Sequence, residues 1–227
     1  MIQYAALIFD LDGTLIDSAP DITTAVNTYF IEQGWPTLDV DYVESFIGHG
    51  PRRLLQDIFN DKGLPADEVS ITRALDAYIE NYARNPAERT RFFPHVPEDL
   101  VALREAGFRL GICTNKTHAL TERILDLLGL APLFDAAIGA DAVPACKPDP
   151  RHLRAVAEKM DLLEGSFAYI GDTRVDRATA EGAGVPFYVV PWGGGANVET
   201  APQQRIERLA DLIVFRPDSV MTRVRKL

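Results

Sequence analysis

Short apolar runs recur along the chain at the length of buried strands. They occupy residues 5–9, 110–113, 136–138, 167–170, 187–190 and 212–214. Helical patterns separate most of them, as where Leu120, Ile124 and Leu127 recur at a spacing of three or four. Because strands that alternate with helices form parallel sheets, we predict an α/β fold built on a doubly wound, Rossmann-like parallel sheet.

Polar residues follow directly after four of the predicted strands. They are Asp10, Thr114-Asn115, Gly139-Ala140-Asp141 and Gly171-Asp172. In open α/β sheets, ligands bind in the crevice outside the carboxyl ends of the strands. We therefore expect these separate pieces of sequence to meet at one site.

Residues 16–89 interrupt the alternation of strands and helices. They contain helical patterns at 21–33, 51–59 and 67–83, and no convincing strand. The stretch 85–97, which holds three prolines, marks the far border. We predict a Rossmann-like core formed by 1–15 and 90–227, with an all-helical cap domain of 16–89 inserted into it.

The composition fits a globular chain and argues against nucleic acid as a partner. The 227 residues are 47% hydrophobic and 25% charged, and 33 acidic against 23 basic residues give a formal net charge of −10. The longest basic runs are only Arg52-Arg53 and Arg225-Lys226. A surface of this charge would repel a phosphate backbone.

The start of the chain and its cysteines bear on location. The first residues hold no basic segment, and the apolar stretch 5–9 is cut short by Asp10, which argues against a signal peptide or a membrane span. Two cysteines, Cys113 and Cys146, are too few for a disulfide framework. We expect a cytoplasmic protein with no membrane partner.

The strongest motif is Asp10-Leu11-Asp12-Gly13-Thr14, directly after an apolar strand. A spacing of two points both carboxylates the same way. Gly13 permits a sharp turn close to a ligand, where free backbone N–H groups would cradle an anion. An ordinary turn rich in Asp and Gly is the alternative, and the motif alone leaves it open.

A second acidic pair, Asp172 and Asp176, follows another apolar strand. One alternative is that Asp172 or Thr173 simply caps the next helix. If both acids converge with Asp10 and Asp12 at one sheet edge, their repulsion would be severe without a cation. Carboxylates, water and phosphate oxygens are the ligands that Mg²⁺ prefers, so the pattern favours a magnesium site.

Lys147 and Thr114-Asn115 offer groups for an anionic ligand. Lys147 is followed by prolines at 148 and 150, which stiffen the backbone. The alternative is a solvated loop lysine. Thr114 and Asn115 supply a hydroxyl and an amide suited to phosphate oxygens. The alternative for them is a helix cap before a helix over 116–128.

Together, these motifs resemble those of the haloacid dehalogenase superfamily. The matching residues are Asp10-Leu11-Asp12-Gly13-Thr14, Thr114-Asn115, Lys147, and Gly171-Asp172 with Asp176. The helical insertion looks like the family's cap. Three further stretches resemble its phosphoglycolate phosphatase-like branch, namely Thr114-Asn115-Lys116, Lys147-Pro148-Asp149-Pro150 and Ile47-Gly48-His49-Gly50.

The resemblance implies a hydrolase of small phosphate monoesters that works through an aspartyl-phosphate. It implies Asp10 as the nucleophile and Asp12 as general acid and base, with Thr114 and Lys147 holding the phosphoryl oxygens. It places Mg²⁺ on Asp10, the backbone carbonyl of Asp12, and Asp172, with Asp176 supporting the metal site from outside. The substrate-binding residues it suggests are Gly13, Thr14, Asn115, Gly48, His49 and Arg52.

The resemblance favours 2-phosphoglycolate as substrate and leaves other monoesters open, such as a phosphorylated amino sugar. Arg52 would pair with a carboxylate, although an arginine on an exposed helix face is the commoner case. A phosphomutase similar to β-phosphoglucomutase is an alternative, whereas a dehalogenase would not need Asp12. A phospho-accepting signalling module shares such acids but is about half as long.

Overall fold

The computed structural model describes residues 3–216 and has a five-stranded parallel sheet at its centre. The strand order is β5-β4-β1-β6-β7, and each neighbouring pair is parallel. The strands are β1 (Ala6–Phe9), β4 (Arg109–Cys113), β5 (Ala136–Ile138), β6 (Phe167–Gly171) and β7 (Phe187–Val189). The doubly wound parallel sheet predicted from the sequence is confirmed.

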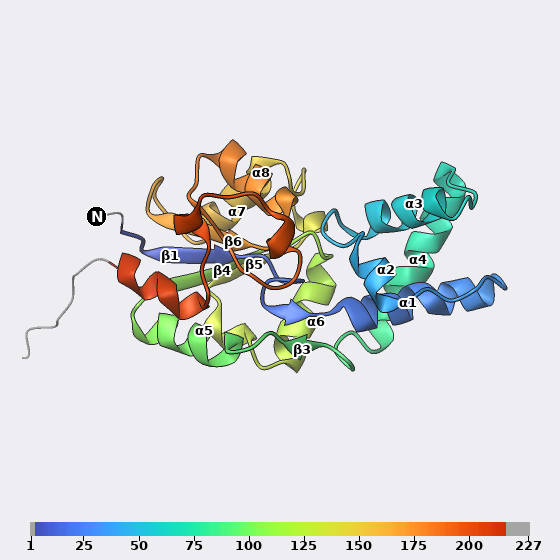
Figure 1. The fold of residues 1–227 in the computed structure, drawn as a ribbon, viewed down its shortest axis with the longest axis horizontal. Helices are drawn as coiled ribbons and strands as arrows, with labels where there is room; N and C mark the ends of the chain where they lie inside the picture. The colour runs from blue at the N-terminus through green and yellow to red at the C-terminus, as the bar shows by residue number, and fades with distance from the viewer. Residues whose placement is uncertain (1–2, 217–227) are drawn as a thin grey trace, which may run out of the picture.

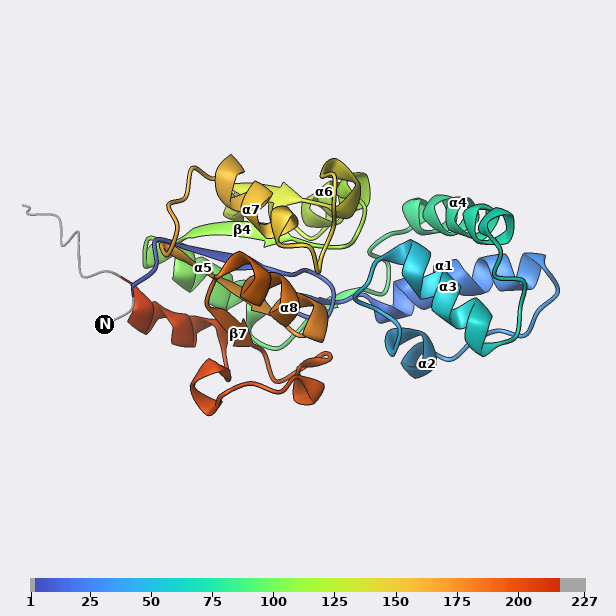
Figure 2. The same ribbon diagram turned by 90° about the horizontal axis from the view of Figure 1, so that it is seen from above.

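Helices cover both faces of this sheet because the strands are apolar on both sides. Within β1, Leu7 and Phe9 join one buried cluster, whereas Ala6 and Ile8 join another. The first face is covered by α5 (Val96–Glu105), α6 (His118–Leu127) and the 3₁₀ helix η5 (Leu209–Phe215). The second is covered by α7 (Pro150–Lys159) and α8 (Arg174–Ala183), as Figure 2 shows from above.

The chain reverses its direction of winding at β1, which decides where a ligand can bind. After β1 the chain first builds β4 and β5 on one side, and then returns to build β6 and β7 on the other. Such a switch point leaves a crevice at the carboxyl ends of the central strands. Those ends point toward a second, helical part of the molecule (Figure 1).

This helical unit consists of four helices that follow β1 in the chain. They are α1 (Ala19–Glu32), α2 (Val40–Glu44), α3 (Pro51–Asp61) and α4 (Glu68–Arg84). Aromatic side chains hold the unit together, with Tyr29 of α1 stacked on Phe59 of α3 at a centroid distance of 6.4 Å. Amphipathic spacing explains the packing, since α3 buries Leu54, Leu55 and Ile58 together with Phe59.

Two short strands join the helical unit to the sheet. They are β2 (Ile16–Asp17) and β3 (Arg91–Phe92), which pair antiparallel. The sequence predicted no strand within 16–89, so β2 is a correction. A strand of two residues is too short to leave a periodic signal. Its partner lies more than seventy residues away, so no local turn signal indicates the pairing either.

The predicted strand at 212–214 is wrong, because these residues belong to η5. Leu209 and Leu212, three residues apart, are fully buried, whereas Val214 is 68% exposed. A spacing of three matches the 3₁₀ turn, so this apolar run packs one stripe against α5 rather than pairing in the sheet.

Four shorter 3₁₀ turns complete the part of the chain that the structure describes. They are η1 (Ala131–Leu133), η2 (Ala140–Ala142), η3 (Gly195–Asn197) and η4 (Pro202–Gln204). None of the helices within 3–216 has the length and apolar character needed to span a membrane. The basic pair Arg225-Lys226 lies outside the described residues.

Candidate active site

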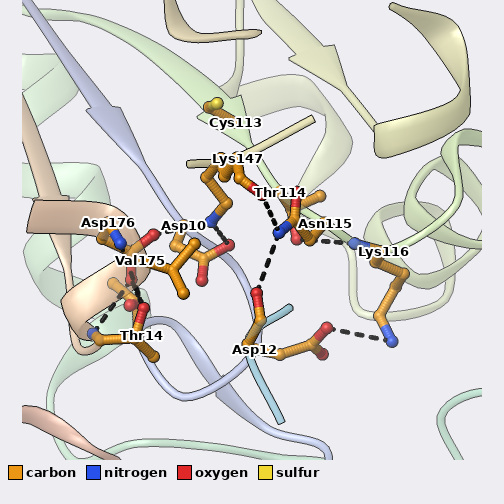
Figure 3. A network of polar contacts seen from close by, with 12 residues as sticks. Asp10, Asp12, Thr14, Cys113, Thr114, Asn115, Lys116, Lys147, Val175 and Asp176 are labelled. Atoms are coloured by element: carbon orange, nitrogen blue, oxygen red, sulfur yellow. Dashed lines mark hydrogen bonds and ion pairs between the residues drawn. The ribbon is translucent and has the colours of Figure 1, made fainter. Parts of the chain in front are cut away.

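The sequence motifs converge at the carboxyl ends of β1, β4 and β6 (Figure 3). Asp10 follows β1, Thr114 follows β4, and Asp172 follows β6. Lys147 reaches the same place from the loop before α7. Because these three strands are neighbours in the sheet, residues more than one hundred positions apart in the chain share one crevice.

Lys147 lies between two buried carboxylates. Its Nζ is 2.8 Å from Oδ1 of Asp10 and 2.7 Å from Oδ1 of Asp176, and it donates to the hydroxyl of Tyr169 at 3.0 Å. Burial alone would lower the pKa of Lys147, but the two carboxylates outweigh it and raise that pKa above its usual range. Lys147 is therefore a fixed buried cation, and the solvated loop lysine is excluded.

Both carboxylate oxygens of Asp176 are occupied. Oδ1 accepts from Lys147 and from the Tyr169 hydroxyl at 2.9 Å, while Oδ2 accepts from N and Oγ1 of Thr173 at 3.0 and 2.6 Å. Thr173 also accepts from the Asp176 N–H, which completes a capping box at the start of α8. Asp176 therefore orients Lys147, and the cap is Thr173 rather than Asp172.

Asp172 faces the crevice and is held by two donors. Its Oδ1 accepts from Oγ1 of Thr14 at 2.8 Å, and its Oδ2 accepts from the N–H of Gly194 at 2.8 Å. Burial, with added repulsion from Asp176 and Asp10, raises the pKa of Asp172 to about 8. Within residues 3–216, no basic side chain forms an ion pair with this carboxylate.

Gly13 lets the first motif approach Asp172. Its φ is +85°, and a Cβ on Gly13 would lie 2.3 Å from Oδ2 of Asp172. The N–H groups of Gly13 and Thr14 donate to the carbonyls of Ile16 and Leu11 within the turn. The backbone donors expected to cradle an anion at Gly13 and Thr14 are thus already used in this structure.

The loop after β7 also closes over this motif. Trp192 donates its indole N–H to the carbonyl of Thr14 at 2.9 Å and stacks on Phe93 at 5.8 Å between ring centroids. Together with the Gly194 bond to Asp172, these contacts make the loop part of the site. Sequence reasoning missed this role, since a glycine-rich turn carries no mark of what its backbone contacts.

The site offers an all-oxygen ligand set for a cation. Asp10, Asp172 and Asp176 each contribute a carboxylate oxygen, and these three atoms lie within 4.8 Å of one another. Since Asp176 is fully engaged, Asp10 and Asp172 hold the spare lone pairs. Burial raises the pKa of Asp10 to about 7 in spite of Lys147. Buried, undercompensated carboxylates fit a hard divalent ion such as Mg²⁺.

Asp12 turns away from this cluster toward the helical unit. Its Oδ1 accepts from the Ser18 hydroxyl, and its Oδ2 lies 3.1 Å from Nζ of Lys116. Lys116 also donates to the hydroxyl of Tyr82, on α4, at 2.9 Å. From sequence, Lys116 was named in the stretch Thr114-Asn115-Lys116 but was assigned no role in the site.

Thr114 and Asn115 are buried, but they differ in what they can still bind. Nδ2 of Asn115 donates to the carbonyls of Gly48 at 3.0 Å and Lys147 at 2.9 Å, so it ties the helical unit to the core. Thr114 lines a cavity beside Asp10. The helix-cap alternative for both is wrong, because α6 begins at His118 with Thr117 as N-cap.

Two hollows lie between the sheet and the helical unit. A cavity of about 40 Å³ is lined by Asp10, Asp12, Thr114 and Gly48, among others. A cleft of about 490 Å³ is lined by Asp172 and His49, among others. Gly48 lines the cavity and His49 lines the cleft, and their binding of substrate stays a prediction.

The structure does not bring Arg52 to either hollow. Its guanidinium pairs with Glu68 at 3.0 Å and donates to Thr72 at 3.1 Å, and its side chain is 47% exposed. Arg52 therefore matches the alternative given above, an arginine on an exposed helix face. Binding of a substrate carboxylate by Arg52 stays a prediction, and in this structure the guanidinium is engaged by Glu68 and Thr72.

Comparison with known proteins places the chain in a family. It matches the model of haloacid dehalogenase-like hydrolases over residues 7–190, and it belongs to this family. The phosphoglycolate phosphatase of Cereibacter sphaeroides is 40% identical over 181 residues, covering 80% of this chain and 82% of that protein. The phosphoglycolate phosphatase of Caulobacter vibrioides is 39% identical over 189 residues, covering 83% and 80%.

Solved structures agree with this placement. The crystal structure of a predicted phosphoglycolate phosphatase from Haemophilus somnus superposes with a TM-score of 0.83 at 26% sequence identity. The match covers 94% of this chain and 98% of that one. The helical unit is therefore part of the shared architecture.

Proposed function

We propose that this chain is a phosphatase that hydrolyses small phosphate monoesters, with 2-phosphoglycolate as the preferred substrate. One observation carries the proposal: the buried Asp10 carboxylate lines the cavity, is held by Lys147 and belongs to a cluster of three carboxylates. The relatives named phosphoglycolate phosphatase support the choice of substrate.

In the proposed reaction, a carboxylate oxygen of Asp10 attacks phosphorus. The new O–P bond forms while the ester P–O bond breaks, and Asp12 gives its proton to the departing alkoxide. Water then attacks the aspartyl-phosphate, Asp12 takes up the proton from that water, and the Asp10 carboxylate is restored. Asp12 suits this role because it borders the same cavity as Asp10.

The other residues of the site position these two acids. Lys147, fixed between Asp10 and Asp176, holds the nucleophile and presents positive charge where the phosphoryl oxygens gather. Thr114, buried beside Asp10, offers its hydroxyl to the same oxygens. When bound by Asp10, Asp172 and the Asp12 carbonyl, Mg²⁺ would supply the charge that offsets repulsion between carboxylate and phosphate.

We further propose that residues 16–89 form a cap over this site, on a core of 1–15 and 90–227. The Asn115 bond to Gly48 and the cavity between the two parts support this division. The cap would exclude bulk water and decide which organic group fits. A cytoplasmic location stays a prediction.

Phosphate release from a panel of monoesters, 2-phosphoglycolate included, tests the function. We expect release with Mg²⁺, none with EDTA, and a loss of at least about 10³-fold in Asp10→Asn, which removes the nucleophile. Asp57→Asn serves as the matched control, since Asp57 pairs with Arg53 on the outer face of α3. If no monoester is hydrolysed, the proposal fails, and dependence on a bisphosphate activator would indicate a phosphomutase.

A further inference from the structure

We propose that Lys116 binds a carboxylate on the leaving group, and so selects small phosphorylated hydroxy acids over neutral phosphate esters of similar size. The proposal rests on the phosphatase function above and assigns its substrate preference to one side chain. The observations behind it are the burial of Lys116, the cavity that Lys116 lines, and the charges that line the neighbouring cleft.

Lys116 is a buried ammonium group shared between the core and the helical unit. Only 6% of the residue is exposed. Its Nζ lies 3.1 Å from Oδ2 of Asp12, donates to the Tyr82 hydroxyl, and sits 4.3 Å from the centre of the Tyr82 ring. A lysine ammonium has three donors, so two known partners leave one for a ligand.

The cavity that Lys116 lines connects it to the reacting groups. Asp10, Asp12 and Thr114 form one wall of this space. The remaining wall is mainly apolar, made by Ile22, Ile47, Pro51, Leu54, Tyr78 and Leu120. Among the described residues that line it, Lys116 carries the only positive charge. A negatively charged group on the organic part of the substrate would therefore pair with the Lys116 ammonium.

The small size of the cavity favours a small organic group. Its volume is about 40 Å³, and one water needs roughly 10–15 Å³ measured this way. Most of the lining is apolar, so the several hydroxyls of a sugar ring would find few hydrogen-bond partners there, which disfavours their burial. A short acid fits both the volume and the single cation.

The other hollow beside the site is unsuited to an anionic group. The acidic residues of its lining outnumber the basic ones: they are Asp12, Asp17, Asp41, Glu44 and Asp172, against Arg174 and His49. Burial, together with Asp17 and Asp41, raises the pKa of Glu44, which marks this surface as rich in negative charge. A carboxylate on the leaving group is therefore repelled from the cleft and attracted to Lys116.

The test compares two substrates that differ in the carboxylate. We expect the wild-type protein to favour 2-phosphoglycolate over 2-hydroxyethyl phosphate in kcat/KM. Lys116→Met should lower this ratio by about 30- to 100-fold, the effect of losing a buried charge-assisted hydrogen bond. Circular dichroism and thermal unfolding report whether the variant folds. The ratio of the two kcat/KM values separates carboxylate binding from the contact of Lys116 with Asp12, whose loss affects both esters alike.

A matched control is Lys62→Met. Lys62 also lies over a tyrosine ring, 3.9 Å from the centre of Tyr42, but it is on the surface of the helical unit. This variant should keep the wild-type ratio. If Lys116→Met lowers kcat/KM equally for both esters, Lys116 only holds Asp12 and Tyr82, and the proposal is overturned.

A second measurement needs no variant. Glycolate should inhibit wild-type hydrolysis of 2-hydroxyethyl phosphate at concentrations where ethylene glycol does not, because only glycolate carries the carboxylate. Equal inhibition by both, or a wild-type protein that prefers the neutral ester, refutes the role of Lys116 and leaves the phosphatase intact. Failure to hydrolyse any monoester refutes the phosphatase itself.

Discussion

Replacing Asp176 with asparagine tests whether the buried charge network stabilises the fold. Asp176 is fully buried and accepts hydrogen bonds from Lys147, Tyr169 and Thr173. In Asp176→Asn, an NH₂ group replaces one of the two accepting oxygens. This donor then faces another donor, either the Lys147 ammonium or the Thr173 N–H, and that hydrogen bond is lost. Lys147 also keeps Asp10 as its only carboxylate partner among the described residues.

The magnitude follows from the cost of breaking a buried ion pair. Removing one partner of such a pair costs about 3–5 kcal/mol, against a total stability of roughly 5–15 kcal/mol for a domain. For a chain of this size, each kcal/mol lowers Tm by roughly 2–4 °C. We expect a loss of at least about 3 kcal/mol and a fall in Tm of roughly 6 °C or more.

Urea unfolding followed by circular dichroism at pH 7, with EDTA present, measures this loss. Glu181→Gln is the matched control, because Glu181 lies on the same helix and pairs with Arg177 at 2.7 Å while 61% exposed. Exposed pairs contribute about 0.3–0.5 kcal/mol. If Asp176→Asn loses no more stability than Glu181→Gln, the carboxylate of Asp176 does not hold Lys147 in the way argued above.

Two further substitutions probe the backbone and the pH response. Gly13→Ala would place a methyl group 2.3 Å from Oδ2 of Asp172, so phosphatase kcat/KM should fall about 10²-fold. Gly34→Ala, with φ of +72° and nothing within 4 Å of its Cβ, should leave activity unchanged. Burial, aided by Lys147, lowers the pKa of His152 to about 4, so the unfolded chain binds the extra proton between pH 6.5 and 4. The unfolding free energy of the wild type relative to that of His152→Gln should therefore fall by up to about 3 kcal/mol on acidification across that window. Asp10 and Asp172, whose raised pKa values act in the opposite sense, titrate in both proteins and cancel in this comparison. Urea unfolding of both proteins at pH 7 and 4.5 measures the difference, and a difference that does not change with pH refutes the prediction.

The core of the site was accessible from sequence because its signals are local. Asp10, Thr114 and Asp172 each end an apolar strand, and a parallel sheet brings such ends to one edge whatever their distance in the chain. The pairing of Lys147 with Asp10 then follows from charge. Local signals did not indicate the further hydrogen bonds that hold these groups, such as the one that Lys147 donates to the Tyr169 hydroxyl.

The residues of the helical unit that line the cavity were harder to predict. Which side chains of a helix face the cavity depends on the orientation of the helix about its own axis. Pro51 and Leu54 line the cavity. Arg52 is adjacent in sequence, but one residue turns the helix by about 100°, which carries its side chain to Glu68 instead. The contacts of Lys116, a residue named from sequence without a role, were not predicted for a related reason, since they depend on Tyr82 from a different part of the chain.

The pairing of β2 with β3 has a consequence for how such proteins diversify. Ile16 lies opposite Phe92 and Asp17 opposite Arg91, so the two chain crossings between sheet and helices are hydrogen-bonded neighbours. An insertion whose ends lie side by side can be exchanged without stretching its host. The segment between β2 and β3 can thus be replaced as a unit. Grafting a relative's segment at these two strands should change the apolar lining given by Ile47, Pro51 and Leu54, and with it the shape of the organic group that fits. The preference for a carboxylate should stay, because Lys116 lies outside the segment.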